Sequence, residues 1–341
     1  MRSDRPIFVV GCPRSGTTML SLMIHAHPRL AMPPESRFLL KAWRRRAVFG
    51  NLQTPKQRMA LAKACVRTGS KIRDLGLDPQ ETLDKILAGP PTIGSAFGIV
   101  FKGFADKHGA ARWGDKRPAY YQEVDVLLRL FPDAQIVHIV RDGRANVASL
   151  KKMPWWPFDS IGSMAAWSQA EYCSLRNAKR LPADVFHVIR YESLVADPEP
   201  VLRVLCDFLE EDFHPAMLEP SEVRDVVPEK KVWHENLKQS VNTDRVESWR
   251  KGLEPWELGL METVLRRKLV RNGYQISGDG KRPSPKLVAR YAKDAFERRG
   301  AMRKRWAEER KEAAAATYPV AARLTSRQLE LAAATGGQRL P

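Results

Sequence analysis

The apolar residues of this chain form short β-branched runs separated by longer stretches with helical periodicity. Three runs predict buried strands, at Ile7–Val10, Gln135–Val140 and Val185–Ile189. The helical pattern of Met19–Ile24 follows the first strand, and that of Pro198–Leu209 follows the third. Strands that alternate with helices are typical of βαβ units, so we expect an α/β fold with a parallel sheet flanked by helices.

A long helical region separates the first strand from the second. Its periodicity predicts four helices, at Ser36–Arg46, Pro55–Thr68, Pro79–Leu87 and Thr92–His108. Residues 35–110 show no strand pattern, so we interpret residues 36–110 as a helical insertion over the sheet. Residues 220–253 are polar and aperiodic, which indicates a long functional loop. Pro255–Asn272 predicts the last helix of a main domain that covers residues 1–280.

Residues 281–341 are predicted to form a basic helical C-terminal extension. The 341-residue chain has a net charge of +18, and this segment contributes +9 of it, with 15 Lys or Arg against 6 Asp or Glu. An apolar stripe with helical spacing runs through it, at Leu287, Tyr291, Ala295, Met302 and Trp306. The helix of residues 287–306 is therefore expected to lie on an anionic membrane, to pack on the domain or to pair with a partner.

Cysteine usage and hydropathy narrow the class of protein. The four cysteines lie far apart and form no Cys-x-x-Cys pair, so a disulfide framework or a zinc site is not expected. No window approaches the ~20 apolar residues that a membrane-spanning helix needs. We therefore expect a soluble, cytoplasmic protein, peripheral at the membrane if its basic helix binds one. The positive charge indicates acidic partners, such as a polyphosphate, an anionic membrane or a nucleic acid.

The turn after the first strand is the strongest chemical signal in the sequence. Gly11 and Gly16 have the spacing of a phosphate-binding P-loop between a strand and a helix, where backbone N–H groups and a helix N-terminus face an anion. The position after Gly16 is Thr17, where a nucleotide triphosphatase carries its lysine. The cation of this loop is Arg14 instead. The loop is therefore suited to a phosphate-like group without a γ-phosphate.

Pro13–Thr18 resembles the 5′-phosphosulfate loop of sulfotransferases that use 3′-phosphoadenosine-5′-phosphosulfate (PAPS), closest to the protein-tyrosine and bacterial branch. Four further segments resemble this family in the expected order: His25–Ser36, Trp113–Pro118, Phe131–Ser149 and Arg190–Leu194. Two positions depart from the family pattern, with Arg117 in place of Thr and Ser193 in place of Asp. The resemblance implies a P-loop-like sulfotransferase fold and PAPS as the co-substrate, without a metal.

The resemblance assigns the nucleotide-binding residues. Arg14, Ser15, Gly16, Thr17 and Thr18 would hold the 5′-phosphosulfate, Arg141 and Ser149 the 3′-phosphate, Tyr191 would flank the adenine, and Trp249 would close over the nucleotide. The sequence supports two of these roles independently. Arg141 follows a buried strand, and Ser149 lies eight residues later, about two helical turns, so both can face the same side. Surface pairing of Arg141 with Asp142 and a core role for Tyr191 are the alternatives.

Two residues are candidates for the chemical step. Glu35 follows a Pro-Pro turn and would accept the proton of the attacking hydroxyl, although an acid is also favoured in the first turn of a helix. His108 is the rival base, because the small-molecule branch of the family uses histidine. Lys116 and Arg14 would stabilise the charge that develops during transfer.

Two other function classes remain to be weighed. An atypical P-loop kinase conflicts with the absence of the loop lysine and of a strand that ends in a metal-binding Asp. A non-enzymatic nucleic-acid module would rest on charge alone, and no nucleic acid is expected as a partner. The acceptor is a hydroxyl of a small molecule, sugar, lipid or peptide, which the sequence does not identify.

Overall fold

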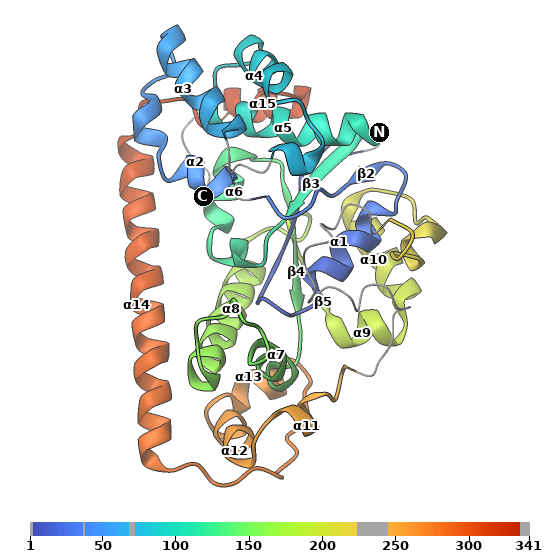
Figure 1. Ribbon diagram of the computed structural model, residues 1–341, viewed down its shortest axis with the longest axis vertical. Helices are drawn as coiled ribbons and strands as arrows, with labels where there is room; N and C mark the ends of the chain where they lie inside the picture. Colours follow the sequence, from blue (N-terminus) through green and yellow to red (C-terminus); the bar gives the residue numbers. More distant parts are fainter. Residues whose placement is uncertain (1–2, 37, 68–71, 224–244, 335–341) are drawn as a thin grey trace.

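The computed structural model describes residues 3–36, 38–67, 72–223 and 245–334. Within these residues, a five-stranded parallel sheet with the order β2-β3-β1-β4-β5 forms the centre of the molecule (Figure 1). The strands are β1 (Ile7–Gly11), β2 (Leu30–Ala31), β3 (Arg112–Lys116), β4 (Gln135–Val140) and β5 (Phe186–Arg190). The strand order reverses at β1, which places the expected ligand site beside the carboxyl end of this strand.

The three predicted strands are confirmed as β1, β4 and β5, but β2 and β3 were not predicted. β3 reads Arg-Trp-Gly-Asp-Lys, and all five of its residues are buried. The Arg112 guanidinium donates to the Leu209 carbonyl at 2.6 Å and lies 3.5 Å from the Glu211 carboxylate. These partners lie about 100 residues further along the chain, so they have no local sequence signal. Their contacts compensate for the burial of a polar strand.

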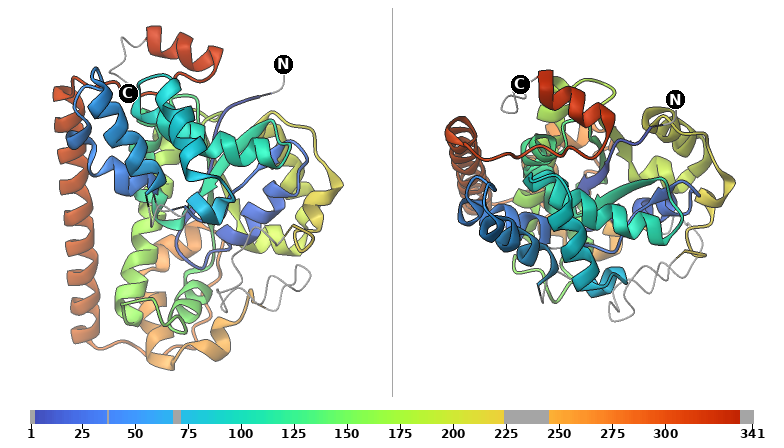
Figure 2. Two further views of the ribbon diagram at one scale, coloured as in Figure 1. Left: turned by 45° about the horizontal axis from the view of Figure 1, so that its top comes forward. Right: turned by 90° about the horizontal axis from the view of Figure 1, so that it is seen from above.

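Helices cover both faces of the sheet (Figure 2). Residues Ile7 and Val9 of β1 face α1 (Thr17–His25), α9 (Tyr191–Ala196) and α10 (Pro198–Leu209). Phe8 and Val10 point to the opposite side, where α5 (Ile93–Lys107), α6 (Val124–Leu130) and α8 (Ser160–Arg180) complete the larger core. The alternation along β1 matches the period of two in a strand whose two faces are both buried.

Helices fill the described part of the region between β2 and β3, as predicted. They are α2 (Phe38–Trp43), α3 (Pro55–Val66), α4 (Pro79–Ala88) and α5, with short 3-10 turns η1 (Arg46–Phe49) and η2 (Ile72–Leu75). The remaining short elements are η3 (Pro118–Gln122), α7 (Gly143–Leu150), η4 (Pro215–Leu218), α11 (Trp249–Gly252), α12 (Pro255–Val264) and α13 (Arg266–Arg271). The single helix predicted at Pro255–Asn272 is wrong, because Leu265 leaves helical geometry and divides it. Residues 224–244 of the predicted functional loop lie outside the described residues.

The C-terminal segment packs along the domain. The long helix α14 (Pro285–Ala315) runs beside α8, and α15 (Ser326–Ala334) follows (Figures 1 and 2). The predicted apolar stripe is buried at Tyr291, Ala295, Met302 and Trp306, and the Trp306 indole N–H donates to the Gln122 carbonyl at 2.8 Å. The interpretation that this stripe lies on a membrane is therefore wrong, and packing on the domain is correct. No described helix combines the length and apolarity needed to cross a bilayer.

Candidate active site at the carboxyl edge of the sheet

The turn between β1 and α1 has the geometry of an anion-binding loop. Gly16 is the N-cap of α1 with a φ of 97°, and no side chain of the described residues caps this helix. A Cβ added to Gly16 would lie 2.6 Å from Cδ2 of Tyr191, so the turn requires glycine. The N–H groups of the first turn of α1 thus have no side-chain acceptor, as in helix termini that bind phosphate or sulfate groups.

Arg14 is held in a strained conformation inside this loop. Its φ is 72°, in the left-handed region that costs a non-glycine residue about 1–2 kcal/mol. Asn146 of α7 fixes the loop around it, because its side-chain amide donates to the Ser15 hydroxyl at 3.0 Å and to the Pro13 carbonyl at 2.9 Å. Strain maintained by surrounding contacts is typical of ligand-binding loops. Asn146 was not predicted, because its spacing from the loop is visible only in three dimensions.

Cys12 also contacts Asn146 rather than solvent. Its thiol donates to the Asn146 side-chain oxygen at 3.4 Å, and burial raises the pKa of the thiol well above its ordinary range. A protonated, buried thiol is a poor nucleophile. Cys12 therefore fills the turn as a small residue, and the loop carries its chemistry on Arg14 and the backbone.

Arg141 and Ser149 meet at Arg14. The Arg14 Nε donates to the Ser149 hydroxyl at 3.0 Å, and the Arg141 Nη1 donates to the Arg14 carbonyl at 3.0 Å. A second donor of Arg141, Nη2, contacts the Arg245 carbonyl at 2.7 Å, and its guanidinium lies 4.5 Å from the centroid of the Tyr191 ring. The predicted 5′ and 3′ binding residues thus form one continuous cluster at the ends of β1, β4 and β5.

This cluster has an excess of positive charge. Within the described residues, neither Arg14 nor Arg141 forms an ion pair, and the Nε of Arg141 is buried without a hydrogen-bond partner. Burial, followed by the repulsion of Arg141, lowers the pKa of Arg14 to about 10, and burial lowers the pKa of Arg141. Because the cations destabilise each other's charged form, an anion bound between them would be stabilised strongly.

Lys116 ends β3 beside this cluster and connects it to Glu35. Its Nζ donates to the Thr18 hydroxyl at 3.2 Å and lies 3.6 Å from the Glu35 carboxylate. The Lys116 side chain is 6% exposed and that of Glu35 is 26% exposed, so the carboxylate is the more accessible end of the pair. The structure thus brings together a loop hydroxyl, a buried ammonium group and a partly exposed carboxylate from three separate segments.

Asp115 is a buried residue whose hydrogen bonds hold the segments of Glu35 and Lys116 in place. One of its carboxylate oxygens accepts the hydroxyls of Ser36 at 3.0 Å and Tyr120 at 2.7 Å, and the other accepts the backbone N–H of Lys116 at 2.9 Å. Burial raises the pKa of this fully enclosed carboxyl to about 6. Asp115 therefore fixes the position of Ser36, which follows Glu35 in the chain, and the position of the Lys116 backbone.

A sequence profile described as the sulfotransferase family matches residues 6–215, which include the loop, Glu35, Lys116 and Arg141. The chain belongs to the sulfotransferase family. Its relatives include the protein-tyrosine sulfotransferase of Drosophila melanogaster, 27% identical over 223 residues, and protein-tyrosine sulfotransferase 1 of Danio rerio, 28% identical over 233 residues. These matches cover 63% and 64% of this chain but 40% and 57% of the relatives, so the chain spans about half of their length.

Solved structures show the same fold. The sulfotransferase domain of the Synechococcus PCC 7002 olefin synthase superposes with a TM-score of 0.56 at 24% identity, covering 79% of this chain and 95% of that domain. The sulfotransferase domain of the curacin biosynthetic pathway gives 0.56 at 22% identity, covering 81% and 100%. The predicted α/β, P-loop-like sulfotransferase fold is therefore confirmed.

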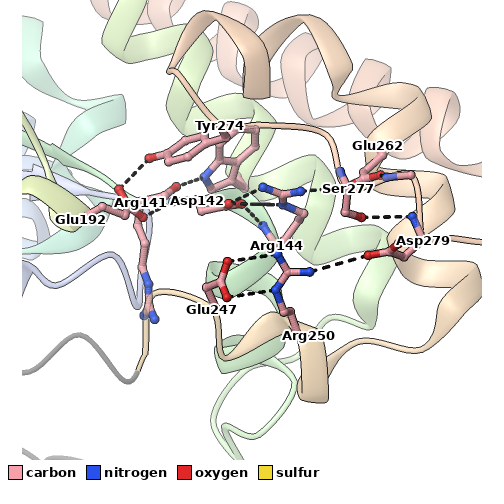
Figure 3. Close-up of polar contacts among 12 residues, drawn as sticks. Arg141, Asp142, Arg144, Glu192, Glu247, Arg250, Glu262, Tyr274, Ser277 and Asp279 are labelled. Carbon is pink, nitrogen blue, oxygen red and sulfur yellow. Dashed lines mark hydrogen bonds and ion pairs between the residues drawn. The ribbon is translucent and has the colours of Figure 1, made fainter.

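A network of ion pairs holds the Arg141 segment of this sulfotransferase in place (Figure 3). Asp142 accepts Arg144 at 2.7 Å, and Arg144 also reaches Glu262 at 2.7 Å. Glu192 accepts the backbone N–H of Asp142 at 2.8 Å and the Tyr274 hydroxyl at 3.0 Å. Asp142 is thus engaged by Arg144 and not by Arg141. Arg144 is 3% exposed and therefore has a buried structural role.

The rival base, His108, lies apart from the cluster, and Trp249 lies beside α7, the helix that carries Ser149. His108 caps the end of α5, where its Nδ1 is 2.9 Å from the Phe104 carbonyl and its ring is 5.3 Å from that of His25. It precedes the start of β3 by four residues, whereas Lys116 ends that strand. His108 and the candidate site therefore belong to opposite edges of the sheet. Trp249 packs on α7 between Arg144 and Arg250, at 4.2 and 4.6 Å from their guanidinium carbons.

Proposed function

We propose that this sulfotransferase moves the sulfuryl group of PAPS to a hydroxyl of an acceptor and releases 3′-phosphoadenosine-5′-phosphate. The observation that carries the proposal is the placement of Lys116 between the loop hydroxyl of Thr18 and the carboxylate of Glu35. A cation beside a phosphate-type loop can stabilise a leaving oxygen, and a carboxylate next to it can accept a proton.

The basic cluster fits the two anionic ends of PAPS. The first turn of α1 and Arg14 would hold the 5′-phosphosulfate, and Arg141 with Ser149 would hold the 3′-phosphate. Two observations support this assignment: the Nε of Arg141 has no hydrogen-bond partner, and Arg141 repels the Arg14 guanidinium. A bound polyanion would accept the free donor and offset the repulsion. Tyr191 would flank the adenine, since its ring already borders Gly16 and Arg141. All of these residues belong to the proposed domain of residues 1–280.

The proposed reaction is an in-line displacement at sulfur. When bound, PAPS supplies a sulfuryl group whose bond to the 5′-phosphate oxygen breaks while a bond to the acceptor oxygen forms. Glu35 accepts the proton that the acceptor hydroxyl loses. Lys116 stabilises the negative charge on the leaving oxygen, and Thr18 orients the ammonium group of Lys116. The position of His108 near the opposite edge of the sheet favours Glu35 as the base.

The acceptor is proposed only as a hydroxyl of a small molecule, sugar, lipid or peptide. The relatives include protein-tyrosine sulfotransferases, whose names give tyrosine as the acceptor. Their names therefore support a hydroxyl group as the acceptor. Glu35 directly precedes the helices between β2 and β3, of which α2 is the first, so we assign the acceptor contacts to these helices.

Nucleotide binding and label transfer together test this function. Calorimetric titration is expected to show binding of 3′-phosphoadenosine-5′-phosphate without metal, and a clear preference over the analogue that lacks the 3′-phosphate. The Arg141→Ala variant should lose most of that preference. Incubation with sulfur-labelled PAPS and cell extract should then label an acceptor.

Two outcomes would contradict the proposal. Binding of Mg·ATP in preference to the 3′-phosphorylated nucleotide would favour the alternative of an atypical kinase. Nucleotide binding that is unaffected by Arg141→Ala, in a variant whose circular dichroism matches wild type, would show that the cluster has been misassigned. The matched control is Arg250→Ala, which changes an exposed guanidinium that pairs with Glu247.

A further inference from the structure

Helix α14 presents an outer face that is distinct from its buried stripe. At 100° per residue, the exposed positions of this helix form a broad arc around the side away from Tyr291, Met302 and Trp306. The outer face is defined here as the exposed residues from Lys286 to the end of the helix. They are Lys286, Ala289, Arg290, Ala292, Lys293, Phe296, Glu297, Arg299, Gly300, Ala301, Arg303, Lys304, Ala307, Glu308, Arg310, Lys311, Ala314 and Ala315.

The outer face carries eight cations and two acids, Glu297 and Glu308, so its net charge is +6. Two other acids of α14 bind cations of the domain. Glu309 and Glu312 bind Arg46 at 3.0 and 2.7 Å, and Glu312 also binds Arg129 at 3.0 Å. Among the described residues, Lys293 of the outer face pairs with Glu297 at 3.9 Å, and Arg290 pairs with Asp159. From Lys286 to Lys311 the helix rises roughly 37 Å, so the charge forms a long, straight stripe.

Phe296 lies in the middle of this stripe, and 78% of its surface is exposed. Ala292 and Gly300 beside it are small, and Lys293 and Arg299 are cations with long aliphatic stems, so that the aromatic ring lies next to these stems on the surface. A bare aromatic ring among Lys and Arg, on a helix that lies flat, is the arrangement of helices that rest in the headgroup region of a membrane.

We propose that the outer face of α14 binds the surface of an anionic lipid bilayer. A net charge of +6 along one straight helix complements the negative surface of such a membrane. A nucleic acid would also attract the charge, but the outer face contains no Asn, Gln, Ser or Thr, the side chains that add neutral hydrogen bonds to phosphates and bases. Phe296 has a function on a bilayer and none on a phosphate backbone. This proposal is independent of the proposed sulfuryl transfer.

Co-sedimentation of the full chain with vesicles tests the proposal. Wild type should bind vesicles that contain about one third phosphatidylserine, and should bind pure phosphatidylcholine weakly. The triple variant R303Q/K304Q/R310Q should lose roughly 100-fold in partition coefficient, at about fivefold for each cation. F296S should also weaken vesicle binding, and its relative effect should be largest at high salt, because salt screens the charge of the cations.

The matched control is K56Q/K63Q/R67Q, which removes the same charge from exposed positions around α3. It should bind anionic vesicles nearly as well as wild type. Circular dichroism and nucleotide titration show whether each variant is folded. Equal losses in both triple variants would overturn the proposal, because binding would follow net charge alone. So would tight binding of duplex DNA, sensitive to R303Q/K304Q/R310Q, by a protein that does not bind the vesicles.

Discussion

Replacing Asp115 with asparagine is expected to change the pH dependence of stability. Burial raises the pKa of this carboxyl to about 6, against an ordinary value of 3.8. Because the folded state holds the proton more tightly than the unfolded state, this contribution to stability is fully present below pH 3.8 and is lost as the pH rises through 6. The whole difference is about 3 kcal/mol, at 1.36 kcal/mol for each pKa unit.

About 2 kcal/mol of this difference falls between pH 4.5 and pH 7. The Asp115→Asn variant has no proton to exchange there. Its free energy of unfolding should therefore rise relative to that of wild type by about 2 kcal/mol from pH 4.5 to pH 7. The substitution also changes the hydrogen bonds of Ser36 and Tyr120, whose hydroxyls then face an amide in place of a carboxyl group. This change shifts the free energy of unfolding by the same amount at every pH. The slope with pH therefore reports the carboxyl group alone.

Urea unfolding at constant ionic strength, at pH 4.5, 5.5, 6.5 and 7, measures the trend. Groups that both proteins share cancel in the difference between their free energies. The control is Asp106→Asn, which changes an exposed carboxylate with 57% exposure that pairs with Lys102. A difference between wild type and Asp115→Asn that stays constant with pH would refute the assignment of a buried, poorly ionised carboxyl beneath the site. A trend of opposite sign would show that Lys116 or another cation, and not burial, determines the pKa of Asp115.

Three further predictions follow from the site and the C-terminal helix. Glu35→Gln should bind nucleotide as wild type does and lose about 10²- to 10⁴-fold in turnover, measured with labelled PAPS, whereas His108→Ala should keep both. Gly16→Ala should lose at least 1 kcal/mol of unfolding free energy and weaken nucleotide binding, because the added methyl group meets the ring packed there. Met302→Ala should cost about 2–5 kcal/mol by urea unfolding, against less than about 0.5 kcal/mol for Phe296→Ala, since the first side chain is buried and the second is exposed.

The large contribution expected from Met302 also changes the interpretation of the C-terminal segment. Composition predicted a basic helical extension at residues 281–341, outside the main domain of residues 1–280. In the structure, the Gly94 N–H donates to the Val320 carbonyl at 2.8 Å, and the Ala322 N–H donates to the Leu130 carbonyl at 2.8 Å. Truncation would therefore expose the core along α8 and remove contacts to α5. We now expect it to lower stability before it changes nucleotide binding.

Periodicity predicted the parts of the fold whose burial is apolar and local. β1 is a continuous apolar run up to Gly11, and β4 is apolar except for Gln135 and His138. α10 begins at a proline and ends where its apolar stripe ends. β3 escaped prediction because Asp115 and Lys116 belong to it. These polar residues are buried only because hydroxyls from Ser36, Tyr120 and Thr18 converge on them. The same contacts that hide the strand from periodicity build the candidate site.

Motif spacing located the nucleotide loop, but it could not rank the arginines near it. Arg141 and Arg144 are three residues apart and both are buried. Their partners separate them: Arg144 lies between two carboxylates, whereas Arg141 contacts carbonyl oxygens and an aromatic ring and keeps one buried donor unpaired. A buried guanidinium that carboxylates of the protein neutralise is a structural residue, because its removal would leave those carboxylates buried and unpaired. One that is left without a carboxylate among the described residues retains its charge for a ligand. By this criterion Arg14 and Arg141 belong to the binding site, and Arg144 to the scaffold that positions them.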